Sequence, residues 1–170
     1  MTEIKKGVLL RGIGSFYTVR EDGTGHEWTL RAPKKLRRQH LTPLPGDRIT
    51  FIPGEGEEHG WIEEILPRTS LCLRPPVANV ETLIIVAAPV PEADLLLADR
   101  QMARAFGQGI RVLLAVNKCD LDASLAAELR AQYAGAGVSV FPVSAREGTG
   151  LAALKAAMAG RTFCCVSMKK

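Results

Sequence analysis

Arg111-Val-Leu-Leu-Ala-Val-Asn117-Lys118-Cys119-Asp120 is the stretch that decides the fold of the second half of this 170-residue chain. Residues 112–116 within it form a short apolar run, which is typical of a buried parallel strand. A polar tetrapeptide, residues 117–120, follows directly. Open α/β sheets hold their ligands in loops at the carboxyl ends of their strands. The stretch therefore predicts an α/β sheet with a ligand-binding loop at residues 117–120.

The surrounding sequence repeats this pattern of apolar runs and helical segments. Further candidate strands lie at residues 82–88 and 138–143, and residues 161–167 form one more. Segments of helical composition and spacing separate or follow these strands, at residues 92–106, 123–133 and 150–158. Alternation of this kind predicts parallel strands covered by helices. We assign residues 74–170 to this α/β domain.

Residues 1–73 have a different pattern, with short strands separated by turn residues. Five candidate strands lie at residues 8–10, 16–19, 27–30, 48–52 and 61–66. Five short strands suit an OB-type barrel. The segment Arg74-Pro75-Pro76 is interpreted as a linker. The predicted fold class is therefore β followed by α/β, with a five-stranded OB-type barrel at residues 1–73.

The tetrapeptide Asn117-Lys118-Cys119-Asp120 predicts recognition of a guanine base. A carboxylate at position 120 can accept two hydrogen bonds, from N1–H and the exocyclic amine of guanine, and adenine does not present this pair. Hydrogen bonds to charged groups contribute about 1.5 to 3 kcal/mol each, so Asp120 would be the specificity residue. The alternative is an ordinary strand-to-helix turn in which Asp120 caps the helix.

A second motif favours the guanine interpretation. Ser144-Ala145-Arg146 follows the next predicted strand, as expected for the loop of a GTPase whose backbone N–H contacts the guanine O6. The predicted guanine-binding residues are therefore Asn117, Lys118, Asp120, Ser144, Ala145 and Arg146.

The residues that would handle phosphate are not found. GTP hydrolysis needs a glycine-rich loop with Lys and Ser/Thr to hold phosphates and Mg²⁺, and a D-x-x-G element. Residues 7–12 have the spacing of the loop, but Ile13 and Gly14 stand at the Lys and hydroxyl positions. Residues 22–25 have the sequence pattern D-x-x-G, but they lie within a predicted hairpin, so only the sequence matches. We therefore predict no catalytic residue and no magnesium site in these residues.

A basic segment in the first half predicts a polyanionic partner. Residues 31–40 contain five cations and no acid. Clustered cations beside an OB surface gain affinity for RNA by displacing phosphate counterions. The alternative is a solvated basic loop. The candidate RNA-binding residues are Arg31, Lys34, Lys35, Arg37 and Arg38.

The cysteine spacing, the length of the apolar stretches and the N-terminus argue against several classes of protein. The four cysteines have no C-x-x-C spacing, which argues against a zinc site. The longest apolar stretch, residues 83–91, is far shorter than the roughly 20 residues that cross a bilayer, and the N-terminus does not resemble a signal peptide. We expect a cytoplasmic protein without a membrane partner.

The order of these motifs resembles that of a known family. A barrel followed by the base-specificity motifs, with no phosphate loop before them, is the order of a circular permutation. The chain resembles the ribosome small-subunit-dependent GTPase A family, which comprises circularly permuted bacterial GTPases with an N-terminal OB barrel. Beyond the guanine motifs, the resemblance rests on residues 46–48, 62–68, 74–80, 97–100 and 117–121.

The resemblance implies a function in ribosome assembly. Members bind and hydrolyse GTP during maturation of the small ribosomal subunit, and their barrel contacts ribosomal RNA. Where members continue into the phosphate loop and a zinc-binding domain, this sequence reads Met168-Lys169-Lys170, so we expect neither the Mg²⁺ nor the zinc site here. We expect these residues to belong to a GTPase but not to hydrolyse GTP alone. The alternative is a non-enzymatic RNA-binding or ribosome-binding OB module with a vestigial guanine pocket.

Overall fold

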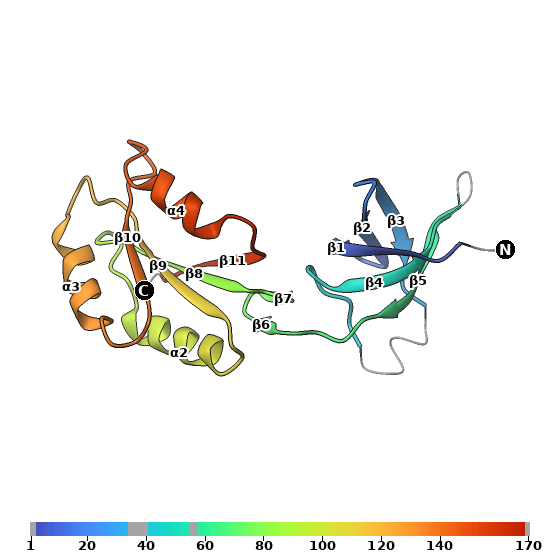
Figure 1. The fold of residues 1–170 in the computed structure, drawn as a ribbon, viewed down its shortest axis with the longest axis horizontal. Helices are drawn as coiled ribbons and strands as arrows, with labels where there is room; N and C mark the ends of the chain where they lie inside the picture. Colours follow the sequence, from blue (N-terminus) through green and yellow to red (C-terminus); the bar gives the residue numbers. More distant parts are fainter. Residues whose placement is uncertain (1–2, 34–40, 55–57, 169–170) are drawn as a thin grey trace. The chain divides into compact units, whose positions relative to one another are not determined.

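The computed structural model describes residues 3–33, 41–54 and 58–168. It divides the chain into two compact units, Met1–Asn79 and Val80–Lys170, which are described separately (Figure 1). No helix in the described part of the chain combines the length and the apolar character that spanning a membrane requires.

The first unit is a closed five-stranded barrel, as predicted. Its strands are β1 (Lys5–Ile13), β2 (Phe16–Glu21), β3 (Glu27–Arg31), β4 (Arg48–Ile52) and β5 (Gly60–Ile65), in the order β1-β2-β3-β5-β4. All pairs are antiparallel except β3 with β5. Alternate side chains fill the interior, and the six central ones are fully buried: Leu9, Val19, Leu30, Ile49, Phe51 and Ile62. Period-two alternation of apolar residues is thus what fills the barrel, and the pairing of β1 with β4 closes it.

The glycines that have the sequence spacing of a phosphate loop belong to the barrel. Gly7 and Gly12 both lie within β1. A Cβ atom on Gly7 would lie 2.5 Å from the backbone oxygen of Arg20 on the paired strand. Gly7 is therefore required by the close approach of two strands, and residues 7–12 lie within strand β1.

A hairpin that the sequence did not predict follows the barrel. Strands β6 (Leu71–Leu73) and β7 (Pro76–Ala78) pair across the segment interpreted as a linker. The Ala78 N–H donates to the Pro45 oxygen, 2.9 Å away. Gly46 has a φ of +88°, and a Cβ there would collide with the Ala78 oxygen. The positive φ and the close contact together require glycine at position 46.

Four residues, Gly46, Asp47, Arg68 and Asn79, join this hairpin to the barrel, and we call them the clasp. Asp47 is fully buried, and its two carboxylate oxygens accept from Arg68 Nε at 2.7 Å and Nη2 at 2.9 Å. Asn79 Nδ2 donates to the Gly46 oxygen at 2.9 Å. The bond to Asp47 raises the pKa of Arg68, so the guanidinium stays charged. The clasp gives a structural role to residues quoted above only for a family resemblance.

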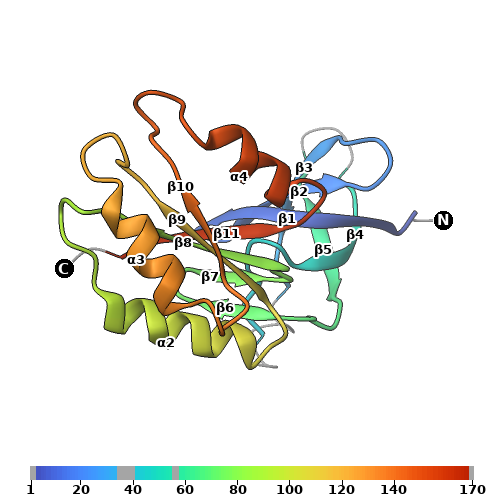
Figure 2. The same cartoon turned by 60° about the vertical axis from the view of Figure 1, so that its left-hand side comes forward.

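The second unit is a parallel four-stranded sheet with helices on both faces. Strands β8 (Thr82–Ala87), β9 (Arg111–Val116), β10 (Ser139–Pro142) and β11 (Phe163–Ser167) take the order β10-β9-β8-β11. The helices are α2 (Leu95–Phe106), α3 (Ser124–Gln132) and α4 (Leu151–Met158). Figures 1 and 2 show α2 and α4 on opposite sides of the sheet. The α/β prediction is confirmed.

Packing explains why these strands are almost uniformly apolar. Side chains of α4 pack against one face of the sheet, around Ile84, Leu113 and Ala115. Helices α2 and α3 lie beside each other, since the Tyr133 hydroxyl that follows α3 donates to Asp99 of α2 at 2.6 Å. Burial on both faces demands apolar residues at successive strand positions. The loops that follow β8, β9 and β10 then gather at one edge of the sheet.

Candidate functional site

Asn117 joins the two predicted guanine loops. It follows β9 directly, and its backbone N–H donates to the Ala87 oxygen at 2.8 Å. Its side-chain Oδ1 accepts two backbone N–H bonds, from Lys118 at 2.9 Å and from Ala145 at 3.0 Å. Because Oδ1 is occupied, the Nδ2 group is the end of this side chain that can donate to a ligand. The motif predicted that Asn117 belongs to the site, but not that it holds the second loop.

Lys118 has an unusual backbone conformation. Its φ is +65°, which is uncommon for a residue other than glycine and is often found at functional sites. Its ammonium group donates to the Val90 oxygen in the loop between β8 and α2. The side chain thus crosses the carboxyl edge of the sheet from the β9 loop to the β8 loop.

Asp120 and Ser144 lie on the loops that follow β9 and β10. Asp120 is exposed, whereas Ser144 is fully buried. The Ser144 Oγ accepts from the Glu147 N–H at 3.2 Å, so its own proton is available to Asp120. The hydrogen bond from Ser144 lowers the pKa of Asp120, with smaller contributions from the charges of Arg146 and Lys118. Asp120 is therefore an ionised, oriented and accessible carboxylate.

The alternative role of Asp120, as a helix cap, does not match this geometry. Ala123 is the N-cap residue of α3, no side chain among the described residues caps this helix, and the nearest acid, Asp122, accepts from the Ser124 N–H and hydroxyl, each at 2.8 Å. The Ser144 hydroxyl, on the loop after β10, is the main cause of the lowered pKa of Asp120.

Ala145 and Arg146 are exposed on the loop after β10. The Ala145 N–H donates to Asn117 Oδ1 in this structure, so a guanine O6 atom would have to share or replace that acceptor. The charge of Arg146 acts on Asp120. All six predicted guanine-binding residues thus belong to the two loops that follow β9 and β10.

A cavity of about 230 Å³ lies beside these loops. Asn117 and Lys118 line it, together with residues at the ends of β8 and β11: Val86, Ala87, Ala88, Val90, Pro91, Ser167 and Met168. Sites that enclose a whole small ligand measure about 300 to 1,000 Å³. The cavity is therefore large enough for only part of a nucleotide.

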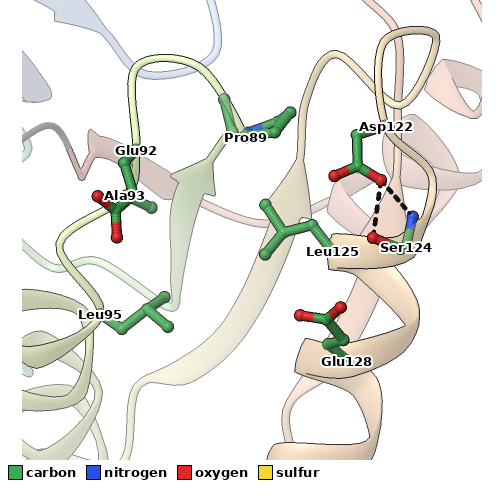
Figure 3. A pocket seen from close by; sticks show the side chains of 9 residues that line it. Pro89, Glu92, Ala93, Leu95, Asp122, Ser124, Leu125 and Glu128 are labelled. Atoms are coloured by element: carbon green, nitrogen blue, oxygen red, sulfur yellow. Dashed lines mark hydrogen bonds between the residues drawn. The ribbon is translucent and has the colours of Figure 1, made fainter.

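A second cavity, of about 340 Å³, lies between the β8–α2 loop and helix α3. Figure 3 shows three carboxylates among its lining side chains, those of Glu92, Asp122 and Glu128. Three acids in one cavity repel phosphate groups. The cavity lined by Asn117 and Lys118 is the better match to a nucleotide on charge alone.

The predicted RNA-binding residues are only partly described. Arg31 is exposed at the end of β3, and its guanidinium carbon lies 5.0 Å from the ring centroid of Phe16. Lys34, Lys35, Arg37 and Arg38 lie outside the described residues. Within the described residues, no group of three or more His, Cys, Asp or Glu side chains is arranged to hold a metal ion.

Comparison with protein families matches both units. Residues 6–62 match the model of the RsgA N-terminal domain, and residues 65–167 match that of the RsgA GTPase. The small ribosomal subunit biogenesis GTPase RsgA of Ruminiclostridium cellulolyticum is 41% identical over 156 residues, which cover 91% of this chain and 51% of that protein. The protein of the same name from Moorella thermoacetica is 40% identical over 158 residues, or 92% and 53% of the two chains. The chain spans about half the length of these curated relatives.

Solved structures agree with the fold. The crystal structure of YjeQ from Thermotoga maritima superimposes with a TM-score of 0.83 at 28% identity, covering 96% of this chain and 60% of that one. YloQ, described as a circularly permuted GTPase, superimposes with a TM-score of 0.77 at 23% identity, covering 98% and 60%. The similarity to YloQ bears on the fold alone.

Proposed function

Since the chain belongs to the RsgA GTPase family, we propose that it is the barrel and guanine-recognition part of a GTPase that acts in small ribosomal subunit biogenesis. In this proposal residues 74–170 bind the base of GTP or GDP. Residues 1–73 bind ribosomal RNA of the small subunit, with Arg31, Lys34, Lys35, Arg37 and Arg38 as candidate contacts.

The observation that carries the guanine proposal is the link between the two loops at Asn117. Asn117 Oδ1 accepts the Ala145 N–H at 3.0 Å, and the Ser144 hydroxyl lowers the pKa of the exposed Asp120 carboxylate. The bond fixes the Asn117 side chain before a ligand arrives, and the lowered pKa keeps Asp120 ionised. Preorganisation of this kind lowers the entropic cost of binding.

Each oriented group has a complementary atom on guanine. The Asp120 carboxylate is suited to accept from N1–H and the exocyclic amine, and Asn117 Nδ2 is suited to donate to N7. Adenine carries an amine where guanine has O6 and no hydrogen on N1. An adenine base would leave the Asp120 hydrogen bonds unmade, which costs affinity.

Competition for labelled GDP tests this proposal. We expect unlabelled GDP to displace a fluorescent GDP from the 170-residue chain, and ADP to require at least about a 100-fold higher concentration, because two charge-assisted bonds are lost. Asp120→Ala should abolish the difference. Asp122→Ala is the matched control, since it removes an acid two residues away that is bonded to Ser124. Equal displacement by ADP and GDP would exclude guanine recognition.

Hydrolysis by these 170 residues alone is not part of the proposal. They contain no glycine-rich loop carrying Lys and Ser/Thr to hold the triphosphate and Mg²⁺, groups that supply most of the rate in phosphoryl transfer. We expect no phosphate release above a no-protein control, with or without small subunits. Release that Asp120→Ala abolishes would contradict this expectation.

The second candidate function is a non-enzymatic RNA-binding module with a vestigial guanine pocket. It is favoured by the basic residues 31–38, because clustered cations bind RNA without any nucleotide. Binding of the chain to small subunits, measured across salt concentrations with and without GDP, separates the two. Salt-sensitive binding that ignores GDP supports the module, and a GDP-dependent affinity supports the GTPase proposal.

A further inference from the structure

Three exposed side chains form a row across the outside of the barrel. In the strand register Phe16 of β2 is opposite Arg31 of β3, and Arg31 is opposite Trp61 of β5. Residues directly opposite one another on neighbouring strands project from the same face of a sheet. Leu30 and Ile62, the neighbours of Arg31 and Trp61 in sequence, are fully buried, so the row projects away from the core.

The two aromatic rings of this row are unusually accessible. Phe16 is 36% exposed and Trp61 is 47% exposed. Aromatic side chains of this size contribute most to stability when they are buried, so two of them in one exposed row indicate a binding surface. Arg31 and His59 already contact Phe16, with the His59 ring centroid 4.8 Å from that of Phe16 in an edge-on arrangement. Trp61 therefore offers the more open ring.

A cavity of about 410 Å³ lies beside the row, lined by Arg31, Glu58, His59 and Trp61. The lining combines one cation, one anion and two aromatic rings. A phosphate group would be attracted by Arg31 but repelled by Glu58. A nucleic-acid base is planar, is uncharged and carries both donors and acceptors, so it matches this mixed lining better than a phosphate does.

The position of the row on the barrel also matches a nucleic-acid ligand. OB folds bind oligonucleotides on the face of strands 2 and 3, between the loops that join strands 1 to 2 and 4 to 5. Phe16 begins β2 directly after the first of these loops, and His59 lies in the second, close to β5. Figure 1 shows β2, β3 and β5 side by side in the barrel.

We propose that Trp61, Arg31 and His59, supported by Phe16, form a stacking site for an unpaired base of a single-stranded RNA. The inference rests on the proposed RNA-binding function of the barrel and adds the site, the residues and the kind of RNA. Trp61 stacks on the face of the base. The planar guanidinium of Arg31, held over Phe16, stacks or donates hydrogen bonds at its edge. Base-stacking residues of this kind bind with little sequence preference.

The test compares one RNA in two forms, a single strand of about ten nucleotides, which is within the length that OB folds bind, and the same strand annealed to its complement. We expect Trp61→Ala in the full chain to weaken binding of the single strand about tenfold or more, and binding of the duplex little. Trp61→Phe keeps a ring and should retain most of the affinity. Phe106→Ala is the matched control, because it removes a 43% exposed ring from α2.

Arg31→Lys distinguishes stacking from phosphate contact. Lysine keeps the positive charge but loses the planar group. We expect Arg31→Lys to weaken binding of the single strand severalfold while leaving its salt dependence unchanged. Circular dichroism and thermal unfolding of each variant establish that the barrel is folded.

Three results would overturn the inference. The first is that the unaltered chain does not bind single-stranded RNA, and the second is that Trp61→Ala weakens single-strand and duplex binding equally. The third is that Trp61→Ala weakens binding to small subunits but not to free RNA. The last would indicate a protein partner at this surface. Small-subunit binding that is unaffected by Trp61→Ala contradicts the stacking site but leaves the proposed function intact. Trp61-dependent binding of single strands without any affinity for small subunits contradicts the proposed function alone.

Discussion

Two aspartates show how differently the two units use a motif carboxylate. Asp47 in the barrel unit is fully buried, and Arg68 and the Leu44 N–H occupy both of its oxygens. Asp120 in the α/β unit is exposed, and the hydroxyl of Ser144 lowers its pKa. Both belong to segments that support the same family resemblance. The first is saturated by its own chain, while the second keeps hydrogen-bonding capacity for a ligand.

The difference teaches that family motifs need not be binding motifs. A buried charge is retained only when it is paired and fully hydrogen-bonded, so Asp47 serves the fold. An accessible carboxylate with a lowered pKa and a fixed orientation is suited to recognition. Burial and the number of satisfied oxygens, which require coordinates, separate the two roles.

The largest expected effect is on stability of the barrel unit. Asp47→Ala should lower the free energy of unfolding by about 3 to 5 kcal/mol, because it leaves the Arg68 cation and the Leu44 N–H without their partner. We expect the lower end of this range, since the Arg68 side chain is 22% exposed. Urea unfolding followed by tryptophan fluorescence measures it, because Trp28 and Trp61 both lie in this unit.

Asp22→Ala is the matched control for that measurement. Asp22 pairs with Arg48 at the surface, where their side chains are 39% and 45% exposed. Exposed ion pairs contribute at most about 1 kcal/mol. Equal destabilisation by the two variants would mean that burial does not distinguish these aspartates.

The next effect concerns base specificity in the α/β unit. Asp120→Asn should weaken GDP binding at least about 100-fold and improve binding of xanthosine diphosphate, because xanthine has a carbonyl where guanine has the exocyclic amine. The unfolding midpoint should not change, since Asp120 is exposed. Competition assays with both nucleotides measure the switch. Unfolding of the unit by Asp120→Asn would assign Asp120 the structural role that we give to Asp47.

A smaller effect is expected at the hydroxyl that orients Asp120. Ser144→Ala removes one neutral donor, so we expect GDP to bind about fivefold more weakly, equivalent to a net hydrogen bond of about 1 kcal/mol. The pKa of Asp120 should rise toward its ordinary value, because the Ser144 bond is the main cause of its lowering. Titration of the carboxyl carbon by NMR reports it directly. An unchanged pKa would mean that Ser144 does not orient Asp120.

The smallest effect is the response of GDP binding to mild acid. The pKa of Asp120 in the folded chain lies below its ordinary value, so the carboxylate that accepts from guanine stays ionised at mildly acidic pH. We expect GDP affinity to be constant from pH 7 to about pH 5. A decline across this range that Ser144→Ala does not alter would point to another titrating group.

The fold could be predicted because its signals are local. Apolar runs such as residues 111–116 mark buried parallel strands over a few residues, and five short alternating segments mark the barrel. The β6–β7 hairpin could not be predicted this way. Its strands have three residues each, and it is held by contacts to residues 45 and 46, far away in sequence.

The candidate site was predictable in its residues but not in its architecture. The tetrapeptide and the Ser144 motif each follow a predicted strand, so sequence could place both on one edge of a sheet. The hydrogen bond from the Ala145 N–H to Asn117 joins groups 28 positions apart, and no local sequence pattern predicts it. The same holds for the Arg68–Asp47 pair.

The sequence by itself determined the two-part organisation, the strands of both sheets and the position of the candidate guanine-binding residues directly after two of those strands, because each depends on side-chain chemistry and spacing within a few residues. Only the tertiary structure decided that Asp47 is a buried partner of Arg68 while Asp120 is an accessible carboxylate, and that Phe16, Arg31 and Trp61 form one row. Strand register and chain closure bring distant residues together, and these depend on how the whole core packs.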